Sequence, residues 1–427
     1  MASMDHVQSR RRPLHTEVRA QETAWPRRHR PDYGLLLLMI ILLAIGLVVI
    51  YSISPGLSQS GHVSQNYYIS KQLIAVALGV VAFIVVSAMP IGVWKRLQTP
   101  LIVAAAASAI AVRLVGQQVN GAYRWIQIGG ISFQSAELIK MALLISLAGF
   151  LSDRIRTGDL GNTRKTLYPV LACLAILVVV VAGLQSDLGS TGVMIVMMAA
   201  MVFVAGMPLK KVVMIGAVVM VILILAVSVL PYGHNRIATY LHPTAHCLTT
   251  SYQTCQALIS VGSGGMIGLG LGRSVQAYGY LPEPANDSIF AIYSEKFGFV
   301  GDAILLGLFM FLFARIKRII ERAPDDYTRL IGVGILAWLS AQALINIGTM
   351  IGVLPLTGIT LPFISYGGTS VLFAMAACGL LFQISRFTTY QAPLSNGQGE
   401  GTNYDNRLNG RRVRRSYNAT ASSRSRA

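Results

Sequence analysis

The sequence predicts an all-α, polytopic membrane protein with about ten transmembrane helices. Of its 427 residues, 54% are hydrophobic and only 12% are charged, and the mean hydropathy is +0.58. This balance is typical of a chain folded in lipid rather than in water. The apolar residues are also grouped into runs long enough to cross a bilayer, which a soluble core does not require.

The predicted spans are apolar runs, each able to cover roughly 30 Å of hydrocarbon as a helix. The weakest boundary is the short polar break at Gln185-Ser186-Asp187, and the eighth run is long enough to tilt or to bend at Gly298 and Gly301. The runs lie near residues 34–54, 72–90, 99–116, 133–152, 167–184, 188–206, 210–231, 287–315, 328–353 and 361–385.

Charge predicts the orientation of these spans. The formal net charge is +18, and most of the 35 lysines and arginines fall in the two tails and in alternate loops. Cytoplasmic loops of membrane proteins carry such an excess, so both termini are expected in the cytoplasm. One large extracytoplasmic loop, about 232–286, is expected on the other side. Because orientation accounts for the basic residues, no nucleic-acid partner is predicted.

The two ends of the chain differ from the membrane domain predicted at 33–387. Residues 1–32 and 388–427 are polar and rich in arginine, and we expect both to be disordered cytoplasmic tails. No cleavable signal peptide is visible in the first tail. Cys247 and Cys255 lie in the outer loop, where an oxidising environment would allow a disulfide between them, although spacing alone does not establish the pair.

This topology limits which acidic residues could carry chemistry outside the membrane. Most carboxylates fall on the cytoplasmic side. The stretch 280–298, YLPEPANDSIFAIYSEKFG, holds three of those that remain, at the mouth of a hydrophobic helix. Charged groups are costly in lipid, so such a cluster indicates binding or chemistry on something polar. The carboxylates left for the outer face are Glu137, Asp187, Glu283, Asp287 and Glu295.

Asp287 is the first candidate within this stretch. It lies at the predicted start of a helix, where an aspartate often serves only as an N-cap. Ser288 could cap the same helix, which would leave the Asp287 carboxylate at headgroup height and partly in water. Glu295 and Lys296, about two turns further, are interpreted as support for the site rather than as its chemistry.

Three further segments carry polar groups in apolar surroundings. Glu137 and Lys140 share a helix face, where a buried ion pair is the structural alternative to a site. Arg124 could anchor the chain at the interface or bind a phosphate. Asp187, next to Gln185, could bind a ligand or cap the next helix. The broken segment 354–370, which includes Ser365, Gly367 and Gly368, could line a headgroup site because irregular backbone at membrane depth needs a cavity or protein around it.

These segments together resemble one family. The blocks NGAYRWI, FQSAELIK, QSDLGS, SYQTCQALISVGSGG, YLPEPANDSIFAIYSEKFGFVG and LPLTGITLPFISYGGTS are similar, in order and spacing, to the SEDS family (shape, elongation, division, sporulation). The resemblance covers about 34–387 and is closer to division than to elongation members. Ser135 and Ser186 stand where the family usually has proline. Lys296 replaces its second glutamate, and the block EPANDSIFA lacks its histidine.

The resemblance implies a peptidoglycan glycosyltransferase that polymerises lipid II into β-1,4 glycan strands. The resemblance also implies that this polymerisation takes place at the outer face of the bacterial cytoplasmic membrane during cell division. A class B penicillin-binding protein and other division proteins are the implied partners. The family's essential aspartate falls on Asp287. Its polar cavity residues fall on Arg124, Glu137, Lys140, Gln185, Asp187 and Ser365.

The chemistry of this reaction requires a single base. A pyrophosphate leaves readily without protonation, unlike the leaving group in ordinary glycoside hydrolysis. We therefore expect Asp287 to accept the proton of the attacking hydroxyl, with Glu283 as the fallback. Arg124, Lys140 or a divalent cation, Mg²⁺ or Mn²⁺, would offset the pyrophosphate charge. A lipid II flippase, another polyprenyl-lipid transporter or a non-catalytic division scaffold are the alternative functions.

Overall fold

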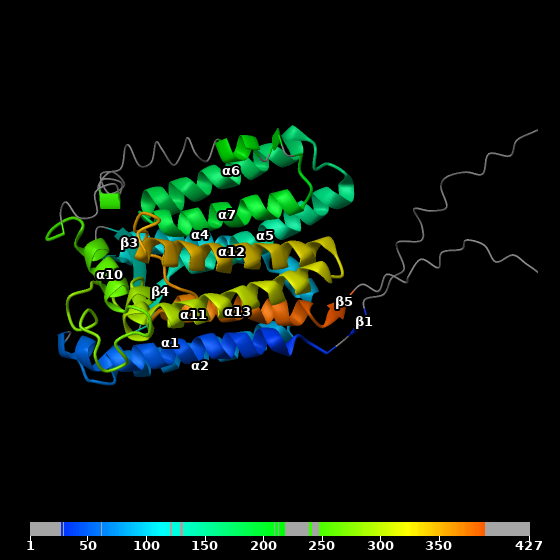
Figure 1. Cartoon of the computed structure of the whole chain (residues 1–427). Coiled ribbons are helices and arrows are strands. Elements are labelled where there is room, and N and C mark those ends of the chain that lie inside the picture. Colours follow the sequence, from blue (N-terminus) through cyan, green and yellow to red (C-terminus); the bar gives the residue numbers. More distant parts are fainter. Residues whose placement is uncertain are drawn as a thin grey trace, which may run out of the picture. The chain divides into compact units, whose positions relative to one another are not determined.

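The computed structural model describes residues 27–28, 30–60, 62–119, 122–128, 131–208, 210–211, 213–217, 239–240 and 247–388. These residues are predominantly helical, and the long helices run side by side (Figure 1). The predicted fold class, a helical polytopic membrane protein, is therefore confirmed.

Nine apolar helical segments within the described residues correspond to nine of the predicted spans. Seven are long and apolar enough to cross a membrane, and α7 and α13 are shorter apolar helices. The tenth predicted span, 210–231, lies largely outside the described residues. The nine are α1 (Tyr33–Ser60), α2 (Tyr67–Ala88), α4 (Gln98–Val115), α5 (Ser135–Thr157), the continuous unit η2 (Thr163–Leu167), α6 (Tyr168–Leu177) and η3 (Val178–Leu184), α7 (Leu188–Val204), α11 (Ile289–Glu321), α12 (Asp326–Met350) and α13 (Gly368–Ile384); the short α3 (Ile91–Arg96) joins α2 to α4.

Two predicted helix boundaries need correction. The last span was expected from residue 361, but α13 begins at Gly368, and 361–367 form turns and bends. Pro362 has no backbone N–H to donate to a helical hydrogen bond. The φ of +66° at Phe363 also lies outside helical geometry. α11 continues to Glu321, beyond its apolar run, because lysine and arginine favour helix as strongly as many apolar residues do.

Two small sheets were not predicted. β3 (Ala122–Ile128) is the centre of an antiparallel sheet with β2 (Gln117–Val119) and β4 (Ile131–Gln134), and β4 leads directly into α5. At the other end of the helices, β1 (Arg27–Arg28) pairs with β5 (Phe387–Thr388) (Figure 1). The pair lies at the junctions between the membrane domain and the predicted tails, and residues 1–26, 29 and 389–427 lie outside the described residues.

The large loop predicted at 232–286 contains a helix, α10 (Tyr252–Ser263), and a glycine-rich segment that packs on α11. α11 is bent at Gly298, where φ is +64°, as predicted for that residue. The backbone amides of Leu269 and Gly270 donate to the carbonyls of Glu295 and Lys296, at 2.9 and 3.0 Å. The glycine-rich segment therefore satisfies the polar groups that the bend exposes, as a membrane interior requires.

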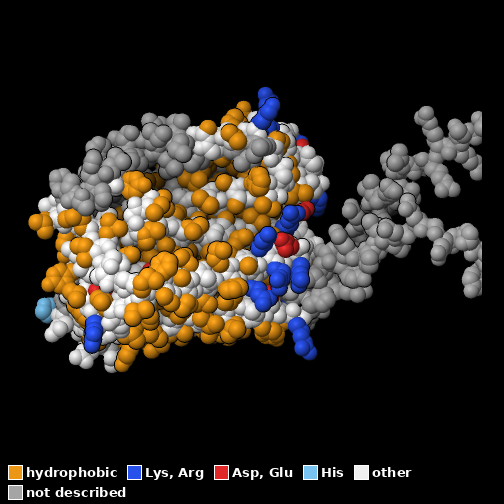
Figure 2. Space-filling view, viewed as in Figure 1, with side chains coloured by type: hydrophobic (Ala, Val, Ile, Leu, Met, Phe, Trp, Pro, Cys, Tyr) orange, Lys and Arg blue, Asp and Glu red, His pale blue; other side chains and the backbone are white. Residues whose placement is uncertain are grey.

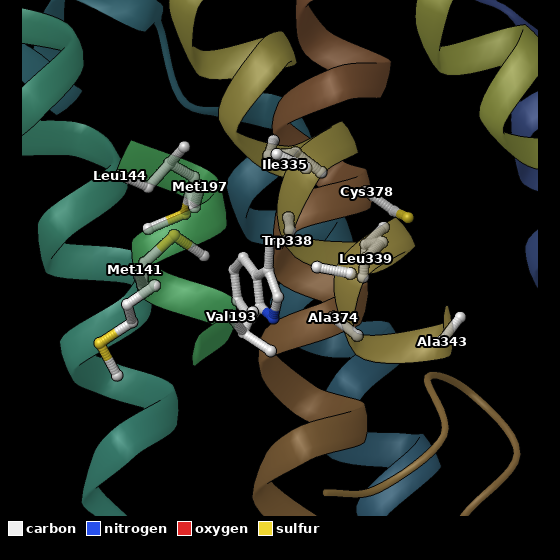
Figure 3. Packing of buried hydrophobic residues seen from close by; sticks show 14 of the residues in the cluster. Met141, Leu144, Val193, Met197, Ile335, Trp338, Leu339, Ala343, Ala374 and Cys378 are labelled. Atoms are coloured by element: carbon white, nitrogen blue, oxygen red, sulfur yellow. The ribbon is translucent and has the colours of Figure 1, made fainter. Parts of the chain in front are cut away.

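Apolar packing fixes α12 against its neighbours. Trp338 of α12 is 1% exposed and lies among Met141 of α5, Val193 of α7 and Ala374 of α13 (Figure 3). Exposed apolar side chains cover the flanks of the helices, while lysines and arginines gather at the end that carries β1 and β5 (Figure 2). The end that carries α10, β3 and β4 has few charged groups on the visible face.

Candidate active site

A pocket of about 480 Å³ is lined by residues of α10, β3 and the loop before α11. α10 and β3 lie at the same end of the long helices (Figure 1). Three stretches far apart in sequence form most of its wall: β3, the loop before α11 and the broken segment before α13. The lining residues are Arg124, Trp125, Gln127, Ser132, Gln253, Pro282, Glu283, Asn286, Asp287, Gly358, Thr360, Tyr366 and Gly367.

Asp287 lies in this pocket and is not the cap of α11. The helix begins at Ile289 and its N-cap residue is Ser288, so Asp287 stands one position outside. Its carboxylate accepts from Nε2 of Gln253, which lies 3.3 Å from both Oδ1 and Oδ2. The structural alternative for this aspartate, an N-cap, is thereby excluded, and the carboxylate faces the cavity.

Asn346 of α12 holds the backbone of Asp287 in place. Asn346 is 1% exposed. Nδ2 of Asn346 donates to the carbonyl of Asp287 at 2.7 Å and to the carbonyl of Ile359 at 2.6 Å. One buried amide thus joins the loop before α11 to the segment before α13. Both segments line the pocket, so this contact sets the distance between its two walls.

Arg124 brings a positive charge from β3 into the same pocket. Nη2 of its guanidinium donates to the carbonyl of Ser186 at 2.6 Å, and Ser186 adopts a φ of +55°, which is unusual for a residue with a side chain. A Cβ at Gly358 would lie 3.3 Å from Nη1 of Arg124 and 3.6 Å from Oδ2 of Asp287. The cation and the carboxylate therefore face a common space beside Gly358, which has no side chain to fill it.

Glu283 and Tyr366 also line the pocket. Glu283 adopts a φ of +49°, unusual for a residue with a side chain, and its carboxylate accepts from Nδ2 of Asn286. Tyr366 packs edge-to-face on Tyr68, with 5.5 Å between ring centroids. Burial, reinforced by the neighbouring tyrosines, raises the pKa of Tyr366 to about 12. The Tyr366 hydroxyl is therefore neutral at physiological pH.

Glu137 and Lys140 form the buried ion pair that was predicted as the structural alternative, behind the pocket rather than in its wall. Nζ of Lys140 lies 2.8 Å from Oε1 of Glu137 and donates to Oε1 of Gln342 at 3.1 Å. Nε2 of Gln342 in turn donates to the carbonyl of Thr360 at 3.0 Å. Since Thr360 lines the pocket, Gln342 connects the ion pair to the cavity wall.

Gln185, Asp187, Ser365 and Gly368 also lie outside the lining residues. Asp187 caps α7, as its alternative interpretation predicted, by accepting from the backbone amide of Ser190 at 3.0 Å. Gln185 accepts from Ser135 at 3.1 Å, and Oγ of Ser365 accepts from the backbone amide of Leu361 at 2.7 Å. These side chains hold the backbone around the pocket, and their contact with substrate stays a prediction.

Glu295 and Lys296 support the loop, as expected. Glu295 is 1% exposed and accepts from the backbone amides of Val275 and Gln276 at 2.8 and 3.2 Å. Nζ of Lys296 donates to the carbonyl of Leu271 at 2.7 Å. Both charges are thus used to fix the chain between α10 and the pocket.

Cys247 and Cys255 form a disulfide, with 5.6 Å between their Cα atoms. This is the pairing that the sequence allowed but could not establish. It joins the turn at 247–250 to the first turn of α10, close to Gln253.

Sequence reasoning did not single out Gln253, Asn346 or Gly358 for the site. A signal for Asn346 was present: Trp338, Gln342 and Asn346 recur every four residues and so share one face of an apolar span. Polar residues within a span often mark a site. In the described residues, no three His, Cys, Asp or Glu side chains gather into a group that could hold a metal by themselves.

Sequence comparison places the whole membrane domain in one family. The model of the FtsW/RodA/SpoVE family, whose members are described as cell cycle proteins, matches residues 33–390. The stage V sporulation protein E of Bacillus subtilis is 36% identical over 368 residues, which cover 85% of this chain and 99% of that protein. The probable peptidoglycan glycosyltransferase FtsW of Coxiella burnetii is 37% identical over 362 residues, covering 83% and 96%.

Solved structures share the fold. A chain from a peptidoglycan synthase complex, described in terms of coordinated polymerization and crosslinking, superimposes with a TM-score of 0.66 and 28% identity, covering 83% of this chain and 98% of that one. The rod shape determining protein RodA of Thermus thermophilus gives a TM-score of 0.59 with 28% identity, covering 85% and 98%.

Proposed function

The chain belongs to the FtsW/RodA/SpoVE family, and we propose that it polymerises lipid II into β-1,4 glycan strands with Asp287 as the general base. It is a multi-pass membrane protein and a peptidoglycan glycosyltransferase. The observation that carries the assignment of the base is the placement of Asp287 one residue outside α11, with its carboxylate in a pocket that also holds Arg124.

The reaction needs one proton acceptor. The 4-hydroxyl oxygen of the acceptor sugar attacks the anomeric carbon of the donor, and a new C–O bond forms on the face opposite the departing pyrophosphate. The hydroxyl proton passes to the Asp287 carboxylate, while the pyrophosphate leaves with the electron pair of the broken C–O bond. Attack from the opposite face inverts the anomeric centre and gives a β bond.

Arg124 is the better placed of the two basic residues predicted to meet the leaving group. Its guanidinium lines the pocket, whereas Lys140 is buried against Glu137 and reaches the cavity wall only through Gln342. A guanidinium can bind two oxygens of a phosphate at once. We assign to Arg124 the stabilisation of pyrophosphate charge, and to Lys140 the support of the segment that carries Thr360.

A divalent cation fits the pocket as a second source of positive charge. The carboxylate of Glu283 provides oxygen donors, which Mg²⁺ and Mn²⁺ prefer, and Mg²⁺ commonly combines one or two carboxylates with substrate phosphates and water. When bound, the ion would supply charge that offsets the pyrophosphate. Glu283 would hold it, which leaves Asp287 to accept the proton.

The location of the site supports an orientation with the pocket outside the cytoplasm. Basic residues gather at the end opposite the pocket, the arrangement expected for the cytoplasmic end. The Cys247–Cys255 disulfide lies at the pocket end and suits an oxidising environment. We therefore place the protein in the bacterial cytoplasmic membrane, with substrate entering from the outer leaflet.

The partner and the cellular role follow from the relatives. The solved peptidoglycan synthase complex couples polymerization with crosslinking, which supports a class B penicillin-binding protein as the partner of this chain. Several similar proteins are named FtsW, which favours a role in division. A flippase, the rival function, is less well supported because the lining groups gather at one end of the helices rather than at their middle.

Polymerisation of purified lipid II, with and without the partner synthase, tests this proposal. Asp287→Asn should abolish glycan strand formation, because an amide cannot accept the proton at neutral pH. Asp302→Asn is the matched control. Asp302 lies within α11, its carboxylate accepts a hydrogen bond from Ser294, and it is not among the residues that line the pocket. Strand synthesis by Asp287→Asn at the wild-type rate would remove Asp287 as the base, and Glu283→Gln would then be examined. Parallel removal of divalent cations with a chelator measures their contribution.

A further inference from the structure

The side chain of Gln253 reaches from α10 to the carboxylate of Asp287. Its Nε2 lies 3.3 Å from Oδ1, 3.3 Å from Oδ2 and 3.1 Å from Oγ of Ser288. The amide thus bridges the two oxygens of the carboxylate from the pocket side, where Gln253 itself is part of the wall.

Two different contacts hold α10 in place. Its C-terminal part is joined to α11 by a hydrogen bond from Oγ of Ser260 to the carbonyl of Ala291, at 2.9 Å. Its first turn, which carries Gln253, is fixed by the disulfide between Cys255 and Cys247. Cys255 is 4% exposed and Cys247 is half-buried, so the helix end of the disulfide is packed into the protein.

We propose that Gln253 is a positioning residue for the Asp287 carboxylate and that the Cys247–Cys255 disulfide keeps it within reach. This inference rests on the proposed function, because it assigns how the general base of that reaction is held. Gln253 acts through Asp287 and forms no bond to the reacting atoms.

The physical reason is that a carboxylate at the edge of a wet pocket is free to rotate about its Cβ–Cγ bond. A donor shared by both oxygens restrains the plane of the carboxylate. It also favours the charged form, which is the form that accepts a proton. Positioning of this kind matters because small displacements of a reacting group cost rate. The disulfide contributes because the first turn of a helix lacks part of its backbone bonding and otherwise frays.

The first test compares Gln253→Met and Gln253→Glu with the wild-type protein in lipid II polymerisation. Loss of a hydrogen bond to a charged group predicts a kcat about tenfold lower for Gln253→Met, with KM little changed. Gln253→Glu should lose more, because it replaces the donor by a like charge. Gln256→Met, on the same helix and outside the pocket lining, is the matched control and should keep the wild-type rate.

The pH–rate profile separates positioning from general damage. A carboxylate that loses donated hydrogen bonds is protonated at higher pH, so the acidic limb should move upward in Gln253→Met and further upward in Gln253→Glu. The other charged or titratable groups that line the pocket with Asp287 are Arg124 on β3, Glu283 on the preceding loop and Tyr366 before α13. They are unchanged in these variants. A profile that coincides with wild type in both variants would overturn the inference.

A double-mutant cycle tests the role of the disulfide. Cys247→Ser with Cys255→Ser should lower kcat about threefold, and the same pair in the Gln253→Met background should add nothing further, because the disulfide acts through Gln253. Independent effects would multiply to about thirtyfold and would contradict that link.

Measuring lipid II polymerisation by Asp287→Asn together with the Gln253 variants distinguishes the proposed function from the inference about Gln253. Normal synthesis by Asp287→Asn would overturn the proposed function. An inactive Asp287→Asn together with a Gln253→Met that matches wild type in rate and pH profile would overturn only the inference about Gln253. If Gln253→Met does not fold, as judged by thermal unfolding, Gln253→Glu gives the same comparison with a side chain of the native shape.

Discussion

Replacing Asn346 should uncouple the two walls of the pocket. Asn346→Ala removes the donor that binds the carbonyls of Asp287 and Ile359, at 2.7 and 2.6 Å. The Ile359 carbonyl is then left without this donor in a buried setting, and the Asp287 carbonyl in a part-buried one. A buried polar group left unsatisfied costs about 1–3 kcal/mol, and two such groups cost about 2–6 kcal/mol together. Because the Asp287 carbonyl is only part-buried, the loss of stability should fall in the lower half of that range. Because Asp287 then loses its backbone restraint, kcat should fall about tenfold to a hundredfold.

Each variant is purified in one detergent. Its kcat for lipid II polymerisation and its thermal unfolding are then measured in that detergent. Asn346→Asp keeps the volume of the side chain but replaces its donor by a charged acceptor facing two carbonyls, and should be worse than alanine in both measurements. Ser340→Ala is the control, since Ser340 lies on the same helix and bonds only the carbonyl of Ala337 within it. A variant of Asn346 that is destabilised by the expected amount yet polymerises at the wild-type kcat would refute the reasoning.

Three further results are expected. Gly358→Ala should lower the rate about tenfold or more, because alanine disfavours the φ of +73° and its methyl group would enter the space between Arg124 and Asp287. Thermal unfolding of the variant would show whether the fold is kept. Lys140→Met should lower stability by about 3–5 kcal/mol by leaving Glu137 buried and unpaired, and Glu137→Leu in addition should recover part of it. Tyr366→Phe should leave the alkaline limb of the pH–rate profile unchanged below pH 10, because a pKa of about 12 keeps that hydroxyl protonated throughout the range.

The membrane fold could be predicted because bilayer thickness fixes the length of an apolar helix. Runs of about 20 apolar residues therefore identify spans without knowledge of how they pack. Asp287 could be found for a related reason: charges are costly in lipid, so the few that remain near the outer face are conspicuous. The bend at Gly298 and the break before α13 were also visible, since glycine and proline mark both.

The contacts that hold Asp287 could not be predicted from its neighbours in sequence. Gln253 and Asn346 lie 34 and 59 residues away from it and meet it only after α10 and α12 have packed against α11. The strands β2 to β4 were missed for a different reason. They are short, and the block AYRWIQI does not alternate strictly between apolar and polar residues, since Trp125 and Ile126 are adjacent. Whether Glu137 and Lys140 faced the substrate or each other was equally a question of packing.

The pocket is built where helices are interrupted, and this links folding to catalysis. Each interruption leaves backbone carbonyls that lipid cannot satisfy. Arg124 binds the carbonyl of Ser186, Asn346 binds those of Asp287 and Ile359, and the amide of Gln342 also donates to a carbonyl of the pocket wall. The side chains that make the irregular backbone tolerable are therefore the ones that position the site. Substitutions of these donors should lower stability and activity together. The Asp287 carboxylate accepts from Gln253, and the side-chain oxygen of an asparagine can accept the same hydrogen bond. Asp287→Asn should therefore lose activity with less loss of stability than the donor substitutions, and this contrast is measurable in one set of purified variants.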